Sequence, residues 1–288
     1  MAGKCWEQYA GGWASVASAE DRLPAGVYWN YESSARGLIF EPLSQKGDDV
    51  LDLPGLPNDF ISDQIDLFWK QREVYHKYKF SHKRGIMMYG PPGNGKSCVI
   101  AGLIKNLIKE DGIVLKVNKF STSSQALTLL KSIEPERKVM TIMEDMDTLL
   151  SGDYKTEEPY ALSMLDGQDQ VDGVVHVATT NYPEQLADRF IKRPGRFDLI
   201  LGIGHPVEET RRAYFEHLLG KQHKEIDTLV AKTEGLSLAY LREIASTYLC
   251  LGIPLEDTIS RLKKNFSTKL KSNGNSVGFT VGYHEPTE

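Results

Sequence analysis

A glycine-rich segment that ends in lysine and serine has the spacing of a phosphate-binding loop. Glycines let backbone N–H groups turn inward and approach phosphate oxygens that a Cβ atom would keep away. In such a loop Lys96 reaches the β- and γ-phosphates of a nucleotide, and the Ser97 hydroxyl binds Mg²⁺. We therefore predict a nucleotide site at Gly90, Pro91, Pro92, Gly93, Asn94, Gly95, Lys96, Ser97 and Cys98.

The segments on either side of this loop have the patterns that the loop requires. Residues 85–89 form a short apolar run typical of a buried strand, and residues 97–110 carry apolar side chains at helical spacing. The start of that helix directs its positive end at the phosphates. Eight positions that fit the pattern, with both flanks correct, favour a phosphate loop over a glycine turn that only joins a strand to a helix.

A second pair of candidate residues follows the apolar strand predicted over residues 139–143. Glu144 and Asp145 stand where a strand end can place one carboxylate near Mg²⁺ and another near the attacking water. Adjacent residues of a strand point to opposite sides, so we predict that Glu144 faces the metal and Asp145 the water. The alternative is a carboxylate cluster that only solvates the loop.

Three further motifs make a family resemblance specific. They are Leu165-Asp166-Gly167, Thr179-Thr180-Asn181 and the segment Arg193-Pro194-Gly195-Arg196-Phe197-Asp198. With the phosphate loop, they resemble the AAA+ ATPases, in the subgroup that contains protein-unfolding and translocating ATPases. The resemblance covers residues 83–203 and, more weakly, residues 233–239. The Glu-Asp order is similar to that of the mitochondrial AAA translocase that acts in assembly of respiratory complex III.

The resemblance implies a role for each matching residue and a homo-oligomer. Asn181 would be the polar sensor that holds the attacking water near the γ-phosphate of ATP. Arg193 and Arg196 would be arginine fingers that act on ATP bound to the adjacent subunit; the alternative is a solvated surface pair. Fingers in trans require a ring, usually of six subunits in this family, or a spiral or filament with the same head-to-tail contact.

The chain also departs from the family pattern. The short segment 118–123 stands where threading ATPases carry a longer pore loop, so Phe120 is either a reduced pore aromatic or a packed loop residue. Arg242 is either a second sensor or an exposed helix residue. For His217 we predict a partly buried structural histidine, although a place near the adenine is the alternative.

The resemblance and the hydrophobic pattern together predict an α/β fold, the three-layer P-loop NTPase sandwich with a mostly parallel sheet. We predict a short accessory segment and linker (1–58), a large ATPase domain (59–205), a helical lid (206–271) and a tail (272–288). Core helices are predicted over 59–80, 124–133 and 159–166, strands over 113–117, 174–178 and 199–203, and lid helices over 208–219, 226–233, 238–251 and 255–270. The segment 151–158 is polar, and we expect it to be mobile.

The accessory segment contains two features of its own. Residues 27–31 and 38–40 read as two short strands of a hairpin. Trp6, Tyr9 and Trp13 either dock on the main domain or a neighbouring subunit, or belong to a frayed terminus.

Composition limits the classes of function. The net charge of −5 gives no sign of a strongly basic nucleic-acid surface, and no apolar run approaches the ~20 residues that span a bilayer. Three scattered cysteines form neither a disulfide framework nor a zinc site, and the histidines show no metal-ligand spacing. We expect a cytoplasmic protein without a membrane partner, from a bacterium or from a bacteriophage acting in its host.

The leading hypothesis is an ATPase motor that remodels a protein complex. A second hypothesis is an ATPase that loads or regulates proteins on nucleic acid, with Lys119, Lys131 and the basic residues of segment 261–271 as candidate contacts. A third is a nucleotide-gated scaffold whose reversed carboxylates bind ATP but hardly cleave it.

Overall fold

The computed structural model describes residues 5–9, 12–16, 21–35, 37–44, 53–151, 156–166 and 171–267. The chain divides into two compact units, Met1–Leu241 and Arg242–Glu288, with the division inside helix α10. None of the helices in the described ranges is long and apolar enough to cross a membrane.

The first unit is built on one nine-stranded sheet with the order β1-β2-β4-β3-β6-β7-β8-β5-β9. Six neighbouring strands, from β3 to β9, run parallel to one another, as predicted, whereas β1, β2 and β4 join antiparallel. The strands are β1 Cys5–Tyr9, β2 Gly12–Val16, β3 Gly26–Ser33, β4 Gly37–Pro42, β5 Lys83–Tyr89, β6 Ile113–Lys116, β7 Val139–Met143, β8 Val174–Thr180 and β9 Leu199–Gly202.

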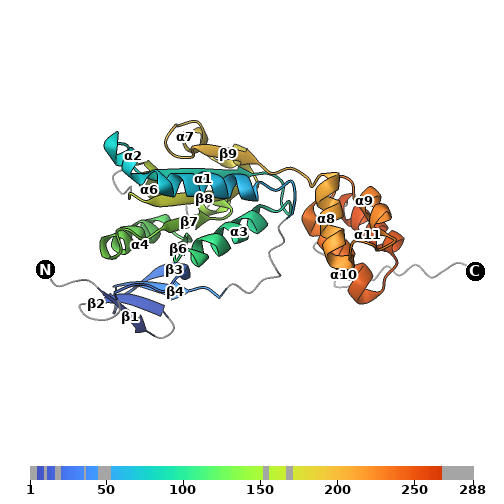
Figure 1. Cartoon of the computed structure of the whole chain (residues 1–288), viewed down its shortest axis with the longest axis horizontal. Coiled ribbons are helices and arrows are strands. Elements are labelled where there is room, and N and C mark those ends of the chain that lie inside the picture. Colours follow the sequence, from blue (N-terminus) through green and yellow to red (C-terminus); the bar gives the residue numbers. More distant parts are fainter. Residues whose placement is uncertain are drawn as a thin grey trace, which may run out of the picture. The chain divides into compact units, whose positions relative to one another are not determined.

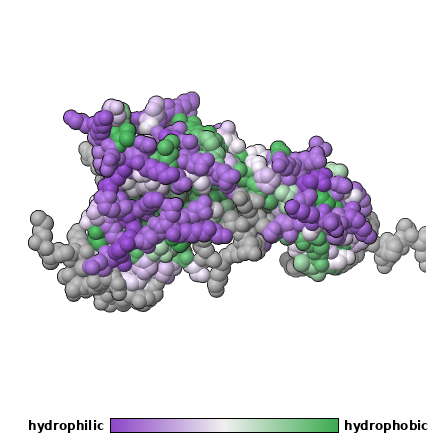
Figure 2. All heavy atoms as spheres, in the orientation of Figure 1, coloured by the Kyte–Doolittle hydropathy of each residue, from purple (hydrophilic) through white to green (hydrophobic). Residues whose placement is uncertain are grey.

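Helices cover both faces of the sheet (Figure 1). One face packs on α1 (Asn58–Lys70) and α3 (Lys96–Lys109), and the other on α4 (Phe120–Ile133) and α6 (Glu158–Asp166). Alternate residues of β5 enter the two layers, since Ile86 and Met88 lie in the first and Met87 in the second. Hydrophilic side chains dominate the outer surface seen in Figure 2. The predicted three-layer sandwich is confirmed.

The predicted N-terminal hairpin is present as β3 and β4, but it is more than an accessory element. β3 pairs in parallel with β6, so the hairpin extends the central sheet. The fully buried Trp6 packs edge-on against Phe40 and donates a hydrogen bond from Nε1 to Glu134 Oε1 at 3.0 Å. Arg137 pairs with the same carboxylate at 3.0 Å. Trp6 therefore docks on the main domain and is not part of a frayed terminus.

Two predicted helices have different bounds. The helix expected over 59–80 is divided at Gln71 into α1 and α2 (Arg72–Lys77), because Gln71 leaves the helical region and its N–H bonds back to Leu67 and Phe68. Helix α4 begins at Phe120, four residues earlier than predicted. The Glu157 carboxylate accepts the Ser121 N–H at 2.8 Å and so caps this extra turn. That cap comes from a distant segment, so local pattern does not reveal it.

Four of the remaining helices correspond to the predicted lid helices. They are α8 (Glu208–Leu219), α9 (Ile226–Lys232), α10 (Leu238–Leu251) and α11 (Leu255–Ser267). Three short elements were not predicted: α5 (Met146–Leu149), a 3₁₀ turn (Pro183–Gln185) and α7 (Asp188–Ile191). The tail after residue 267 and residues 152–155 of the predicted mobile segment lie outside the described residues.

Candidate active site

The glycine loop joins β5 to α3 in a conformation that its glycines require. Gly90, Gly93 and Gly95 have φ values of 148°, 78° and 102°, a region that side chains with a Cβ rarely adopt. A Cβ atom on Gly90 would also overlap the carbonyl oxygen of Ile203. No side chain caps the start of α3 at Gly95, so the first N–H groups of this helix remain available to an anion.

Lys96 lies inside the loop and has little solvent exposure. Its ammonium group donates hydrogen bonds to the carbonyl oxygens of Gly90 at 2.6 Å and Pro91 at 3.0 Å. Burial lowers the pKa of Lys96, and the nearby carboxylates of Asp145 and Asp147 oppose that shift. Asn94 is buried beside it, and neither side-chain amide atom has a partner among the described residues. The loop thus holds a cation and the uncapped start of α3 close together, which suits the binding of a phosphate.

Glu144 faces the serine of the loop. Its Oε1 accepts the Ser97 hydroxyl at 3.2 Å, and its Oε2 pairs with Lys116 Nζ at 2.6 Å. A hydroxyl and a carboxylate are hard oxygen ligands of the kind that Mg²⁺ prefers. The described residues contain no cluster of three or more His, Cys, Asp or Glu that could hold a metal by themselves. Ser97 and Glu144 thus fit a Mg²⁺ ion that takes its other ligands from water and nucleotide.

Asp145 faces away from Glu144, toward the next strand. Its backbone adopts the left-handed conformation with φ 48°, its N–H donates to Thr179 Oγ1, and its Oδ1 accepts the Asn181 amide at 2.8 Å. The side chain is exposed. The two adjacent carboxylates therefore separate, one toward the serine and one toward the predicted sensor. The chain bend at Asp145 strengthens the divergence that strand alternation alone predicts.

The two predicted arginine fingers lie at the edge formed by the amino ends of the parallel strands, whereas the phosphate loop lies at the edge formed by their carboxyl ends. Arg193 and Arg196 precede β9, and the backbone of Arg196 packs against Gly85 near the start of β5. The phosphate loop follows the end of β5, a seven-residue strand that spans about 20 Å at the usual rise per residue. Neither arginine therefore lies near the phosphate loop of its own subunit.

The two arginines differ in exposure. The Arg193 side chain is 62% exposed, whereas that of Arg196 is 4% exposed and pairs with Asp166 at 3.2 Å. A solvated pair is therefore the wrong interpretation for Arg196. Its burial also conflicts with a direct role as a finger, because it would have to leave Asp166 to reach another subunit.

Other predicted residues have clear positions. Phe120 is buried at the first turn of α4, so of its two interpretations the packed residue is confirmed. His217 is exposed near the end of α8, so the prediction of partial burial is wrong. Cys98 is exposed on α3. Arg242 lies on α10 in the second unit, and its role as a second sensor stays a prediction.

Lys116 and Lys83 are site residues that sequence reasoning missed. Lys116 ends β6 beside β7, and its pairing with Glu144 follows from strand order, which no local motif specifies. Lys83 is the first residue of β5. Its ammonium group bonds to the carbonyl oxygens of Leu165 and Gly195, in two segments far along the chain.

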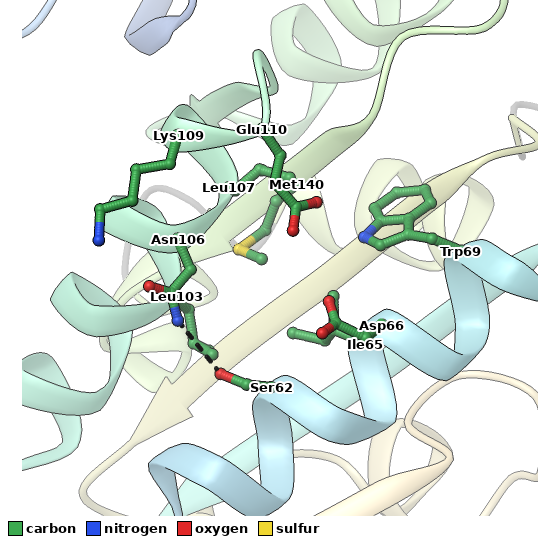
Figure 3. Close-up of a pocket in the computed structure, with 10 residues that line it drawn as sticks. All are labelled: Ser62, Ile65, Asp66, Trp69, Leu103, Asn106, Leu107, Lys109, Glu110 and Met140. Carbon is green, nitrogen blue, oxygen red and sulfur yellow. Dashed lines mark hydrogen bonds between the residues drawn. The ribbon is translucent and has the colours of Figure 1, made fainter.

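A groove of about 180 Å³ lies apart from these residues, between α1 and α3. Its floor includes Ile65, Leu107 and Met140, and Asn106 donates to the Ser62 hydroxyl across it at 3.4 Å (Figure 3). None of the phosphate-loop residues lines it. The groove is therefore separate from the candidate nucleotide site.

Comparison with known families agrees with this geometry. The model of the AAA family, the ATPase family associated with various cellular activities, matches residues 86–205. The chain therefore contains a segment that matches the AAA ATPase domain. The matched segment holds the phosphate loop, both carboxylates, Asn181 and both arginines, and it begins three residues after Lys83.

Curated relatives are similar to this chain over part of their own, longer sequences. An AAA ATPase forming ring-shaped complexes from Bifidobacterium dentium is 28% identical to this chain, over 70% of this chain and 45% of its own length. A protein of the same name from Bifidobacterium adolescentis is 26% identical, over 70% of this chain and 46% of its own length. A probable mitochondrial chaperone bcs1 from Schizosaccharomyces pombe is 28% identical over 59% and 39%. The chain thus matches less than half the length of these relatives.

Proposed function

We propose that this protein hydrolyses ATP in an assembly of identical subunits and uses the turnover to remodel a protein complex. The observation that carries the proposal is the separation of the active-site groups between the two edges of the sheet. Each subunit has a complete set of nucleotide-binding groups at one edge and an exposed arginine, Arg193, at the other. The phosphate loop of one subunit therefore has neither arginine of that subunit near it, and a neighbouring subunit can supply Arg193.

Each residue at the nucleotide edge has a task that its position supports. Lys96 and the N–H groups of the loop would bind the β- and γ-phosphate oxygens. Ser97 and Glu144 would hold Mg²⁺, which neutralises charge on those oxygens when bound. Asp145 would orient the attacking water and accept its proton, while Asn181 holds the carboxylate in place.

Arg193 would complete the site from the adjacent subunit. A guanidinium group stabilises the charge that spreads over the phosphoryl oxygens as the bond to ADP breaks. The names of two relatives, which describe ring-shaped complexes, support a head-to-tail assembly. A hexameric ring is the form that we propose, and a spiral or filament would use the same contact.

Remodelling of a protein complex is proposed over the two alternatives. The chaperone name of the fission-yeast relative favours a protein substrate. For nucleic acid, Lys131 is a poor candidate contact, because its ammonium group already bonds to the Pro135 and Arg137 carbonyls at 2.6 and 2.9 Å. A scaffold without hydrolysis would not need Asp145 and Asn181 to be paired in an exposed position facing the site.

The test is the ATPase rate per subunit measured against protein concentration, with and without Mg²⁺. We expect the rate to rise with concentration and to fall steeply when Arg193→Ala subunits are doped into wild type. Arg212→Ala, which removes an exposed arginine of α8, is the matched dopant and should only dilute the activity. A negligible rate at every concentration, with ATP still bound, would contradict the proposal and favour the scaffold.

A further inference from the structure

We propose that Lys83, Asp166 and Arg196 form a clamp that positions Arg193, and that Arg196 is a positioning residue which does not contact nucleotide. The proposal rests on the proposed function, since it concerns how Arg193 is presented to a neighbouring subunit. It assigns a role to Lys83, which lies outside the matched AAA segment. It also assigns different roles to two arginines of one motif.

Asp166 is the centre of the clamp, at the last residue of α6. Its Oδ2 pairs with Arg196 Nε at 3.2 Å, and its Oδ1 accepts from Arg196 Nη2 at 3.3 Å. The same Oδ2 lies 3.3 Å from Nε of Arg193. Arg196 thus lies within ion-pair distance of Asp166 through two nitrogens, of which Nη2 donates a hydrogen bond. Arg193 contacts the same carboxylate through Nε, but its side chain remains 62% exposed.

Arg196 is tied further by the backbone around it. Its Nη1 donates to the carbonyl oxygen of Arg189 in α7. Arg189 in turn pairs with Glu158 at the start of α6 at 2.5 Å. With a side chain that is 4% exposed, Arg196 could reach a neighbour only by giving up its contacts with Asp166 and with the Arg189 carbonyl. Burial and pairing therefore make Arg196 part of the support.

Lys83 closes the clamp from the sheet. Its ammonium group donates to the Leu165 carbonyl at the end of α6 and to the Gly195 carbonyl between the two arginines. One side chain thereby links three segments: the start of β5, the end of α6 and the arginine loop. Burial lowers the pKa of Lys83, while Asp198 and Asp166 oppose that shift, so the clamp contains charges of both signs.

The backbone under the clamp is fitted closely to it. A Cβ atom on Gly85 would overlap the Arg196 carbonyl oxygen, and the Gly85 N–H donates to Asp198 Oδ2 at 2.9 Å. The Asp198 N–H returns a bond to the Gly85 carbonyl at 2.8 Å. The loop between Arg193 and Asp198 is therefore fixed at both ends, and Arg193 projects from a rigid base. Preorganisation of this kind favours stabilisation of the transition state over ground-state binding.

The first test measures the two arginines chemically, without reference to turnover. Phenylglyoxal, which modifies accessible guanidinium groups, is applied to dilute nucleotide-free full-length protein, and mass spectrometry follows each site. In the wild type we expect Arg193 to react at least about tenfold faster than Arg196. In Asp166→Asn or Lys83→Met, Arg196 should become accessible, and its rate should come within about threefold of the Arg193 rate. Equal rates in the wild type would overturn the clamp.

The second test is a double-mutant cycle in steady-state ATPase kinetics. Asp166→Asn should lower kcat about tenfold with KM for ATP within about twofold, and it should add no further loss to Arg193→Ala, because its effect passes through Arg193. Lys83→Met should behave alike, and Lys83→Arg should restore most of the activity. Losses that multiply in the double variants would overturn the proposal. Thermal unfolding shows whether each variant is folded. If Asp166→Asn does not fold, the double-mutant cycle of Lys83→Met with Arg193→Ala tests the proposal in its place.

The clamp and the proposed function can fail separately. If Arg193→Ala keeps wild-type turnover at every protein concentration, the proposed function is wrong, whatever the labelling rates show. If Arg193→Ala is inactive but Arg196 is labelled as fast as Arg193, the clamp is wrong and the proposed function stands.

Discussion

The two edges of the parallel sheet are built differently. At the carboxyl ends of the strands, Asp145 is exposed, and no side chain caps the start of α3 at Gly95. At the amino ends, Arg196 and Gly85 are buried, and Asp166 and Lys83 bond to several segments at once. The edge at the carboxyl ends is therefore accessible to a ligand (the open edge). The edge at the amino ends is held together by contacts among its own residues (the closed edge).

The difference indicates what each edge requires. A nucleotide edge must exchange its ligand in every cycle, so its polar groups face space that the ligand fills. An edge that donates one side chain to a neighbour gains from being fixed before the neighbour arrives, because less ordering remains to oppose the contact. The same strand, β5, connects both edges.

The largest expected effect comes from the lysine of the open edge. Lys96→Met removes the cation that lies among the loop carbonyls, so we expect turnover to fall by at least about 10³-fold and ATP binding to weaken. Lys105→Met, on the exposed face of the same helix, is the matched control and should leave both unchanged. Radiolabelled ATP hydrolysis and binding of a fluorescent ATP analogue measure the two effects. Full turnover in Lys96→Met would show that the loop does not bind the reacting phosphates.

The two carboxylates of the open edge should differ in effect. Asp145→Asn should lower kcat about 10²- to 10⁴-fold while ATP still binds, because we propose that Asp145, which accepts the Asn181 amide, orients the attacking water. Glu144→Gln should mainly raise the Mg²⁺ concentration needed for half-maximal activity, since Glu144 faces Ser97. A Mg²⁺ titration of both variants distinguishes the roles. The reverse pattern would show that the assignment is wrong.

The closed edge should respond in stability. Gly85→Ala places a methyl group on the Arg196 carbonyl, so we expect unfolding to become easier by about 3 kcal/mol. Gly102→Ala is the contrast, because that site on α3 has open space, and alanine should stabilise the helix by about 0.5–1 kcal/mol. Urea unfolding of both variants measures the difference. Equal stabilities would mean that the arginine loop does not pack on β5.

The smallest effect concerns His176 in the middle of the sheet. Complete burial lowers the pKa of His176 to about 3, and its Nδ1 lies 2.8 Å from Thr141 Oγ1. In the unfolded chain the His176 imidazole binds a proton as the pH falls through about 6.5, whereas in the folded chain it stays neutral. The contribution of His176 to the free energy of unfolding is therefore fully present above that pH and is lost progressively below it. The limiting slope is about 1.4 kcal/mol per pH unit. His176→Gln should flatten this slope in urea unfolding between pH 6.5 and 4.5, whereas the exposed His205→Gln should not.

Sequence reasoning predicted the open edge well because its chemistry is local. Loop spacing, two apolar strands and a carboxylate pair lie in short segments, and parallel strands bring their ends together. The structure accordingly places Ser97 near Glu144 and Asp145 near Asn181. The predicted roles of these residues remain for kinetics to test.

The closed edge was less predictable because its contacts join distant residues. Nothing near Lys83 in the sequence indicates the Leu165 and Gly195 carbonyls, which lie 82 and 112 residues away. The sequence motif implies the same role for Arg193 and Arg196. The two differ in the exposure of their side chains, which only the structure shows. The early start of α4 at Phe120 has the same cause, because Glu157 supplies its cap from another segment.

The most direct test of the account mixes two inactive variants. Lys96→Met subunits lack a working phosphate loop but retain Arg193, and Arg193→Ala subunits have the reverse defect. If the two edges act in different subunits, mixed assemblies contain contacts where an intact loop meets an intact arginine, and ATPase activity should return to about a quarter of wild type at an equal ratio. Activity that stays at the level of the separate variants, although both assemble and Arg193→Ala binds ATP, would contradict the central claim that the site is completed in trans.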